Sequence, residues 1–246
     1  MISNKNILLV GGCGFIGHNL ALHLKRNGNN PTIVDSLEIN NLNAKPDDEI
    51  INKDLYNAIL NNRLQLLKEN KIDCIIKDVK DLLDVEEIYK KINPDIIIHL
   101  AAVSHANKSN KDPHTTFENS FRTLESSLEF AKIKKTHLIY LSSSMVYGNF
   151  ESLEVNEDSN CNPIGIYGNL KLSGEMMVKA YNQAFDLPYT IIRPSALYGE
   201  RCVSRRVGQI FIENAIQNKP IKINGDGEDK LDFTYIKDLI EGISIC

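Results

Sequence analysis

Short apolar segments recur six times along the chain with helical patterns between them, and this alternation limits the possible folds more than any other feature. The segments span residues 6–10, 31–35, 72–78, 94–102, 136–144 and 187–195. They are apolar almost throughout, as strands are when both faces of their sheet are covered. Strands that alternate with helices predict a parallel sheet with helices on both sides. We therefore predict an α/β fold built on a doubly wound parallel sheet.

Composition narrows the class of protein. The chain has 246 residues, 42% hydrophobic and 24% charged, and this length is enough to bury a sizeable core. The formal net charge of −4 gives no general attraction to nucleic acid or to an anionic membrane. We expect neither as a partner, so any phosphate must be bound locally, by backbone amides or a few cations.

The cysteines and the apolar runs bear on the cellular compartment. Five cysteines are scattered without a C-x-x-C pair, which argues against a disulfide framework or a zinc site, and we expect no bound metal. The start, MISNKNILLVGG, has too short an apolar run for a signal peptide, and no later run could cross a bilayer. We expect a cytoplasmic protein.

Two regions lie outside the strand–helix alternation. Residues 36–71 make a long connection, polar at first and then helical over 57–70, which is either surface decoration or a functional lid. Near the end, the pattern predicts a helix over 206–220 and a strand over 221–224. Residues 233–246 are typical of a short strand that runs into a helix.

A glycine-rich turn directly follows the first predicted strand. In LLVGGCGFIGHNL, Gly11, Gly14 and Gly17 stand three residues apart, and the segment also fits G-x-G-x-x-G. Between a strand and a helix, this pattern allows a tight turn, a close approach to a pyrophosphate and a helix N-terminus aimed at it. A purely structural turn is the alternative. We predict a Rossmann-type cradle for a dinucleotide.

Acidic residues after the second and third strands extend this site. Asp35 ends the second strand, where a carboxylate can bind both ribose hydroxyls and repel a 2′-phosphate, which favours NAD over NADP. A solvated loop aspartate is the alternative. Asp78 and Val79 are placed to hold the adenine by a carboxylate hydrogen bond and a backbone contact, although spacing alone leaves this open.

Tyr167 and Lys171 stand four residues apart at the start of a predicted helix, in GIYGNLKLSGE. This spacing puts both side chains on one face, either as ordinary surface or as an acid–base pair. Ligands of a doubly wound sheet bind at the carboxyl ends of its strands. The serines at 142–144 and the start of this helix therefore border the crevice of the glycine turn, which favours the acid–base pair.

These segments together resemble the extended short-chain dehydrogenases, the NAD-dependent epimerase/dehydratase family that acts on nucleotide sugars. The matching segments run in order as GGCGFIG, Asp35, KDVKD, IIHLAA, SSSMVYG, YGNLK, IIRPSALYGE and GDGEDKLDFTYIKDL. They cover nearly all of the chain, and their order and spacing are highly specific.

The resemblance implies a role for each matched residue. Tyr167 is the general base or acid, Lys171 is its electrostatic partner, and Ser143 hydrogen-bonds the reacting sugar oxygen. Asn119 stabilises the helix beside the fourth strand. The residues expected to contact NAD are Gly11, Gly14, Phe15, Ile16, Gly17, Asp35, Asp78, Val79, Leu100, Ala101, Ala102, Tyr167 and Lys171.

The implied substrate is a nucleotide-diphosphate sugar. The expected contacts to it are Ser143, His105, Arg201 and Arg205. Leu231 stands where family members carry an arginine that pairs with the diphosphate. The candidates to replace that arginine are Lys230, Arg201, Arg205 and Arg206.

The implied reaction is epimerisation through a transient keto-sugar. Ser144 and Met145 occupy the places where the family's 4,6-dehydratases carry an Asp-Glu pair, which disfavours that reaction. A keto-sugar reductase or dehydrogenase, or a dehydratase of the same family, is an alternative. An NAD-binding protein without turnover is another, because family members continue well past the equivalent of Cys246.

The resemblance also implies an architecture. We expect an NAD-binding domain over 1–195, to which 232–246 returns, and a small, apparently truncated substrate lobe over 196–231. A homodimer through helices near 113–133 and 165–186 is implied as well.

Overall fold

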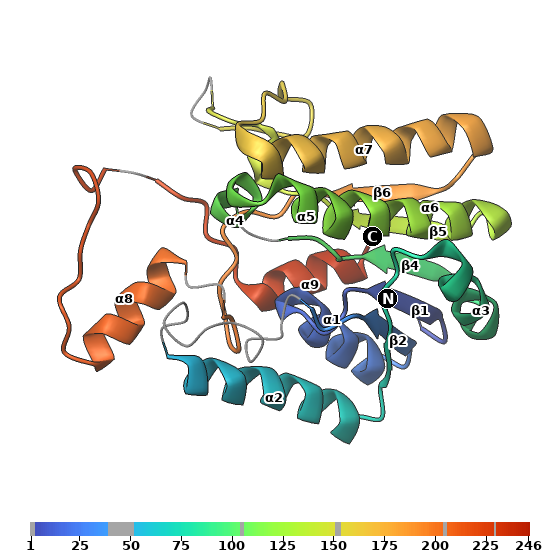
Figure 1. The fold of residues 1–246 in the computed structure, drawn as a ribbon, viewed down its shortest axis with the longest axis horizontal. Helices are drawn as coiled ribbons and strands as arrows, with labels where there is room; N and C mark the ends of the chain where they lie inside the picture. The colour runs from blue at the N-terminus through green and yellow to red at the C-terminus, as the bar shows by residue number, and fades with distance from the viewer. Residues whose placement is uncertain (1–2, 39–51, 104–105, 151–153, 204–205, 229) are drawn as a thin grey trace.

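The structure is a computed structural model, and it describes residues 3–38, 52–103, 106–150, 154–203, 206–228 and 230–246. Its centre is a six-stranded parallel sheet in the order β3-β2-β1-β4-β5-β6 (Figure 1). The strands are β1 (Asn6–Val10), β2 (Asn30–Asp35), β3 (Asp73–Ile76), β4 (Ile96–His99), β5 (His137–Leu141) and β6 (Tyr189–Ile192). This order defines a doubly wound sheet, so the predicted fold class is confirmed.

Helices cover both faces of the sheet. They are α1 (Phe15–Arg26), α2 (Lys53–Glu69), α3 (Leu82–Ile92), α4 (Ala106–Lys111), α5 (Pro113–Phe117), α6 (Thr123–Lys134), α7 (Gly165–Phe185), α8 (Val207–Ile216) and α9 (Ile236–Ser244), with a π-helical turn η3 (Glu118–Arg122) and a 3₁₀ turn η4 (Ser144–Val146). Helices α1, α2 and α9 pack on one face, and α3, α6 and α7 pack on the other (Figure 1).

The alternation of side chains along β1 shows why the strands are apolar throughout. Ile7 and Leu9 enter the core beneath α1 and α9, whereas Leu8 and Val10 enter the core beneath α3, α6 and α7. Successive side chains of a strand point to opposite faces, so a strand covered on both sides needs apolar residues at every position. The register then aligns Val10 with Val34 of β2 and with His99 of β4 at one edge of the sheet.

The predicted strand segments are longer than the observed strands at their carboxyl ends. The segment predicted over 94–102 ends as a strand at His99, and the one predicted over 136–144 ends at Leu141. The small and apolar residues that follow continue the sequence pattern, but they leave the hydrogen-bonded ladder. They form the loops at the edge where the candidate site lies.

The end of the chain contains one element as predicted and one that differs. Ile236, Leu239, Ile240 and Ile243 of α9 are buried in the core beneath α1, so this helix packs back against the sheet. Residues 221–224 form no strand, and this prediction is wrong. Ile221 and Ile223 are exposed, and an isolated strand has no neighbour with which to pair its backbone. The division of the chain into two domains stays a prediction.

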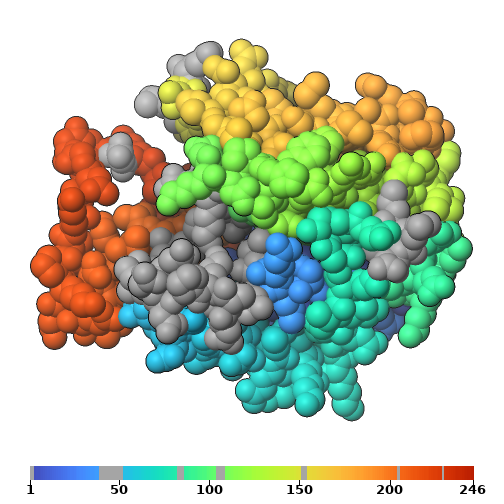
Figure 2. All heavy atoms as spheres, viewed as in Figure 1, coloured from blue at the N-terminus to red at the C-terminus, as the bar shows by residue number. Residues whose placement is uncertain are grey.

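The helix that precedes this segment is held by α2. The Glu213 carboxylate of α8 accepts hydrogen bonds from Tyr56 Oη at 2.6 Å and from Asn52 Nδ2 at 3.0 Å. In Figure 2 the segment that contains α8 forms an arm on one side of the molecule. Helix α2, from the long connection after β2, is thus the support for this arm. The first part of that connection, 39–51, lies outside the described residues.

Candidate active site

The glycine turn between β1 and α1 has the shape of a cradle. Gly11 has φ +79°, and a Cβ there would lie 2.7 Å from the backbone of Ala101, so the turn can press against the end of β4 only with glycine. A Cβ on Gly17 would lie 2.4 Å from the carbonyl oxygen of Gly12, which closes the helix onto the turn. Gly14 is the N-cap of α1, and a Cβ there would meet only Gly11 O, at 3.4 Å.

This cradle fits a diphosphate. The N-cap of α1 makes no side-chain hydrogen bond, and the first turn carries no acidic residue. The first amides of the helix and its positive dipole end are therefore available to an anion. Phe15 and Ile16 of this first turn pack against the core and fix the direction of the helix.

Asp35 ties the second strand to the glycine turn. Its Oδ2 accepts from Cys13 N at 2.9 Å, and its Oδ1 accepts from Leu37 N at 2.8 Å. Burial raises the pKa of Asp35, and the two backbone hydrogen bonds act in the opposite direction. Each oxygen keeps a second lone pair, so the carboxylate can still accept from a ribose hydroxyl. Among the chain's own groups, Asp35 also sets the shape of the cradle.

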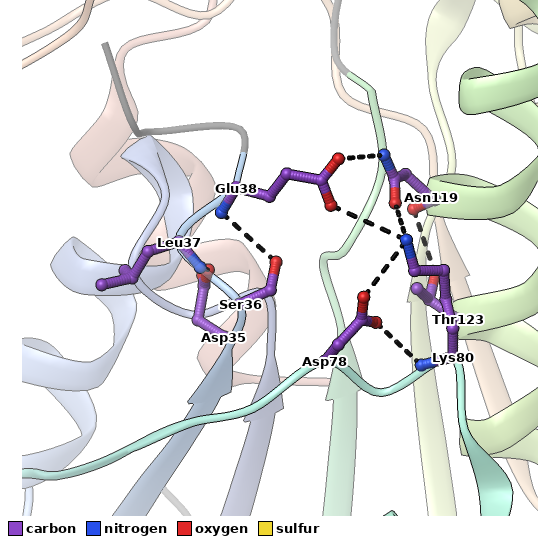
Figure 3. A network of polar contacts seen from close by, with 8 residues as sticks. All are labelled: Asp35, Ser36, Leu37, Glu38, Asp78, Lys80, Asn119 and Thr123. Carbon is purple, nitrogen blue, oxygen red and sulfur yellow. Dashed lines mark hydrogen bonds and ion pairs between the residues drawn. The ribbon is translucent and has the colours of Figure 1, made fainter. Parts of the chain in front are cut away.

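A polar network beside Asp35 joins three elements (Figure 3). Lys80 Nζ lies 3.1 Å from Asp78 Oδ2, donates to Asn119 Oδ1 at 2.9 Å, and lies 3.7 Å from Glu38 Oε2. Asn119 Nδ2 in turn donates to Glu38 Oε1 at 3.4 Å. The network therefore connects the ends of β2 and β3 to η3. A π-helical turn of this kind often marks a functional site.

Lys80 is a site residue that sequence analysis missed. It belongs to the matched segment KDVKD, but nothing in its spacing indicates that its side chain reaches Asn119. Val79, its neighbour, is buried, and its carbonyl oxygen accepts from Ser126 Oγ at 2.5 Å. The loop expected to hold the adenine is thus fastened to α6.

Ser143 and Tyr167 meet at the carboxyl end of β5. Ser143 is the N-cap of η4, and its Oγ accepts from Met145 N at 3.2 Å. Its side chain also hydrogen-bonds Tyr167, which lies in the first turn of α7. Burial raises the pKa of Tyr167, while the hydrogen bond with Ser143 and the positive charge of Arg206 act to lower it.

Lys171 lies one turn further along α7 and is buried. Its Nζ donates to the carbonyl oxygen of Leu141 at 2.6 Å and lies 5.1 Å from the centre of the Tyr140 ring. Burial lowers the pKa of Lys171 to about 8, against the opposing effect of Glu175. Its role as electrostatic partner of Tyr167 stays a prediction, because the effects that lower the pKa of Tyr167 in this structure come from Ser143 and Arg206.

A buried ion pair behind these residues was also missed by sequence analysis. Glu175 accepts from Arg193 Nε at 2.9 Å and from Arg193 Nη2 at 2.7 Å. Ser142 Oγ donates to the same carboxylate, and Arg193 Nη1 donates to Tyr147 Oη at 2.9 Å. This network fixes α7 to the ends of β5 and β6. The only sequence signal is the glutamate that stands four residues after Lys171.

The predicted substrate contacts are distributed over several places. His105 and Arg205 lie outside the described residues. Arg201 donates to His18 Nε2 at 2.9 Å and to Asn19 Oδ1 at 3.1 Å, so its guanidinium is bound to α1, and its substrate role stays a prediction. Arg206 is the N-cap of α8 and acts electrostatically on Tyr167.

The remaining predicted positions follow β4. Leu100 N donates to Val10 O at 2.8 Å and continues the alignment of the two strands. Ala101 and Ala102 are half-buried, and Ala101 lies against Gly11. Small residues here leave room in front of the glycine turn.

Two structural searches concern other kinds of site. Within the described residues, no three or more His, Cys, Asp or Glu side chains are grouped to hold a metal ion. In the same part of the chain, no helix is both long enough and apolar enough to span a bilayer.

The sheet order, the glycine cradle and the residues at the end of β5 define a Rossmann-type dinucleotide-binding enzyme domain. The model of the NAD-dependent epimerase/dehydratase family matches residues 7–246. The chain belongs to this family, so the resemblance stated from the sequence is confirmed. The named relatives are enzymes, and NAD is the cofactor of the family.

Individual relatives show how far the similarity extends. The chain is 30% identical to a dTDP-D-glucose 4,6-dehydratase of Dictyostelium discoideum, over 98% of this chain and 55% of that protein. It is also 30% identical to the uncharacterized UDP-glucose epimerase YtcB of Bacillus subtilis, over 97% of this chain and 71% of that protein.

A solved structure shows a similar fold. The UDP-glucuronic acid 4-epimerase of Bacillus cereus, in complex with UDP-glucuronic acid and NAD, superposes with a TM-score of 0.82 at 30% identity. The match covers 97% of this chain and 71% of that one.

Proposed function

We propose that this chain takes part in the NAD-dependent epimerisation of a nucleotide sugar through a transient keto-sugar. The observation that carries the proposal is the hydrogen bond between Ser143 and Tyr167, at the same sheet edge as the glycine cradle. The solved relative with UDP-glucuronic acid and NAD supports both the substrate class and the cofactor.

Each residue has a defined task in this reaction. Bound NAD accepts a hydride from the sugar carbon and later returns it to the opposite face. Tyr167 takes the proton of the sugar hydroxyl, and Ser143 hydrogen-bonds the same oxygen and holds it near the phenol. Lys171 places a positive charge at the end of β5, where it favours the phenolate over the phenol.

The cofactor is held by groups of the chain on both sides of β1. The amides of the glycine turn and the N-terminus of α1 bind the diphosphate, and Asp35 binds the adenosine ribose. Asp78 and Val79 hold the adenine. The carboxylate of Asp35 repels a 2′-phosphate, so we propose NAD rather than NADP.

Arg206 is the cation that we assign to the substrate. Of the four candidates to replace the missing arginine, it is the one whose charge reaches Tyr167. Arg201 is occupied by α1, and Lys230 is exposed. An arginine at this position binds the diphosphate or an acidic sugar group close to the reacting carbon.

The test is conversion of UDP-sugars in the presence of NAD, followed by separation of the epimers. We expect Tyr167→Phe to lower the rate by a factor of about 100 or more, because the general base is lost. Tyr181→Phe is the matched control, because Tyr181 lies on the same helix but donates to Glu129, away from the site. Equal rates for Tyr167→Phe and the unchanged chain would refute the role of Tyr167.

The same assay separates the alternatives. A keto-sugar reductase consumes nicotinamide in proportion to product, whereas an epimerase regenerates it. NAD binding without conversion of any nucleotide sugar would favour a binding protein. A 4,6-dehydratase is disfavoured, because neither Ser144 nor Met145 can act as a carboxylate acid–base pair.

A further inference from the structure

Two cysteines that lie far apart in the sequence meet beneath the glycine turn. Cys13 is in the turn and is 3% exposed, and Cys74 is on β3, where it pairs with Ile33 of β2. Both thiols belong to the core between the sheet and α2, and Cys74 is half-buried. Their side chains hydrogen-bond each other.

The hydrogen bond makes the two sulfurs unequal. It raises the pKa of Cys13 and lowers the pKa of Cys74, as expected when Cys13 donates its proton to Cys74. Cys74 is also the more accessible thiol. A thiolate is the form that reacts with oxidants, so Cys74 is the sulfur that an oxidant reaches first.

A buried cation completes this cluster. Arg63 of α2 is fully buried, and its guanidinium donates to the carbonyl oxygen of Arg201. Its charge lowers the pKa of Cys13, which opposes the effect of burial. A positive charge beside a thiol favours the thiolate. The cluster therefore has an accessible sulfur, a second sulfur in contact with it, and a cation.

We propose that Cys13 and Cys74 form an oxidisable pair, which a peroxide converts to a disulfide that weakens dinucleotide binding at the glycine turn. The first half, disulfide formation, stands on the thiol cluster alone. The second half rests on the proposed function, because it assumes that the turn binds NAD.

The reaction has two steps. The Cys74 thiolate attacks one oxygen of hydrogen peroxide, the O–O bond breaks, and Cys74 becomes a sulfenic acid while hydroxide leaves. The Cys13 sulfur then attacks the Cys74 sulfur, the S–O bond breaks, and the leaving hydroxyl takes the thiol proton as water. Two thiols lose two electrons and hydrogen peroxide is reduced to two molecules of water.

Disulfide formation acts on the cofactor site through the backbone of Cys13. A disulfide brings the two sulfurs to about 2 Å, much closer than a thiol hydrogen bond. Cys13 lies between Gly12 and Gly14, and its amide donates to Asp35 Oδ2 at 2.9 Å. Movement of Cys13 toward β3 therefore displaces both the diphosphate cradle and the carboxylate expected to bind the ribose.

The experiment is a titration of the unchanged full chain with hydrogen peroxide, followed by non-reducing peptide mapping by mass spectrometry. We expect a cross-linked peptide pair that contains Cys13 and Cys74. Cys74→Ser should remove the cross-link, whereas Cys246→Ser, which changes an exposed cysteine, should leave it. Absence of the cross-link in the unchanged chain, with Cys74 oxidised only to higher acids, would overturn the first half.

The effect on binding is measured separately by calorimetry with NAD. We expect the oxidised chain to bind NAD about tenfold or more weakly, and a reductant to restore the affinity. Because coupling is reciprocal, NAD should also slow the oxidation. A disulfide that forms without changing NAD affinity overturns the second half alone. A reduced chain that binds no NAD refutes the proposed function and leaves the disulfide result valid.

Discussion

At the scale of single residues, the candidate site depends on charges that are buried beside one another. Lys171 is held by a carbonyl oxygen and an aromatic ring, while Glu175 is neutralised by Arg193. Burying a charge is costly unless it is paired and hydrogen-bonded. The site therefore keeps its cation only because the surrounding groups were placed for it, and two predictions follow from this arrangement.

The first prediction concerns the pH dependence of activity. The pKa of Lys171 is about 8, so its ammonium is present below pH 8 and is lost above it. The facing groups are Tyr140, Glu175 and His99, and burial keeps His99 neutral by lowering its pKa to about 3. We expect kcat/KM for epimerisation to fall as the pH rises through about 8.

The check is the same pH profile measured for Lys171→Arg. A guanidinium stays charged over this range, so the alkaline decline should move to higher pH even where the overall rate is lower. An identical decline in both proteins would show that another group titrates.

The second prediction concerns stability. Glu175→Gln removes the charge that pairs with Arg193 and leaves that guanidinium without its carboxylate in a buried place. Breaking a buried pair in this way costs about 3–5 kcal/mol of unfolding free energy. Glu125→Gln is the control, because its pair with Arg122 is exposed and contributes about 1 kcal/mol or less. Urea unfolding of both variants measures the difference, and equal losses would contradict the prediction.

At the scale of elements, the turn between β1 and α1 is the most constrained part of the fold. Its glycines serve different purposes: Gly11 admits the end of β4, Gly17 admits the turn itself, and Gly14 leaves the helix end open. Helix α2 has a comparable role at a distance, because it carries Arg63 into the core and holds α8 through Glu213.

The third prediction tests the close contact at Gly17. Gly17→Ala places a Cβ 2.4 Å from a backbone oxygen that cannot move without opening the turn. We expect a loss of about 1–3 kcal/mol in unfolding free energy, together with weaker NAD binding. Gly208→Ala is the matched control in α8, where a Cβ meets no atom within 4 Å and the change should be neutral or stabilising. Similar thermal shifts for the two variants would disprove the steric explanation.

At the scale of the whole molecule, apolar side chains remain exposed on α6 and α7. Met176 is 64% exposed on α7, and Ile133 of α6 and Phe185 of α7 are also exposed. These helices are the ones through which the family resemblance implies a homodimer. Exposed apolar residues that gather in one region are typical of an interaction surface.

The fourth prediction uses this surface. We expect the chain to be a dimer by light scattering, and we expect Met176→Lys to shift it to monomer, because a buried lysine without a partner is unfavourable at an interface. Ile212→Lys is the control, since Ile212 of α8 is 62% exposed but lies on another element. A monomeric unchanged chain, or dissociation by both substitutions, would contradict the prediction.

The sequence determined the features that depend on residues close together along the chain. The six strands, the glycine turn and the one-turn spacing of Tyr167 and Lys171 are local patterns, and period and spacing alone indicate them. The lengths of the strands were less certain, because small apolar residues continue beyond the last ladder hydrogen bond.

Only the tertiary structure decided which distant side chains meet. Lys80 with Asn119, Glu175 with Arg193, and Cys13 with Cys74 each join elements whose positions follow from the order of the strands. A single sequence carries no signal for such contacts, because they depend on the crossing of helices over a twisted sheet. For the same reason, Arg201 bound to α1 could not be distinguished from Arg206 beside Tyr167 by spacing alone.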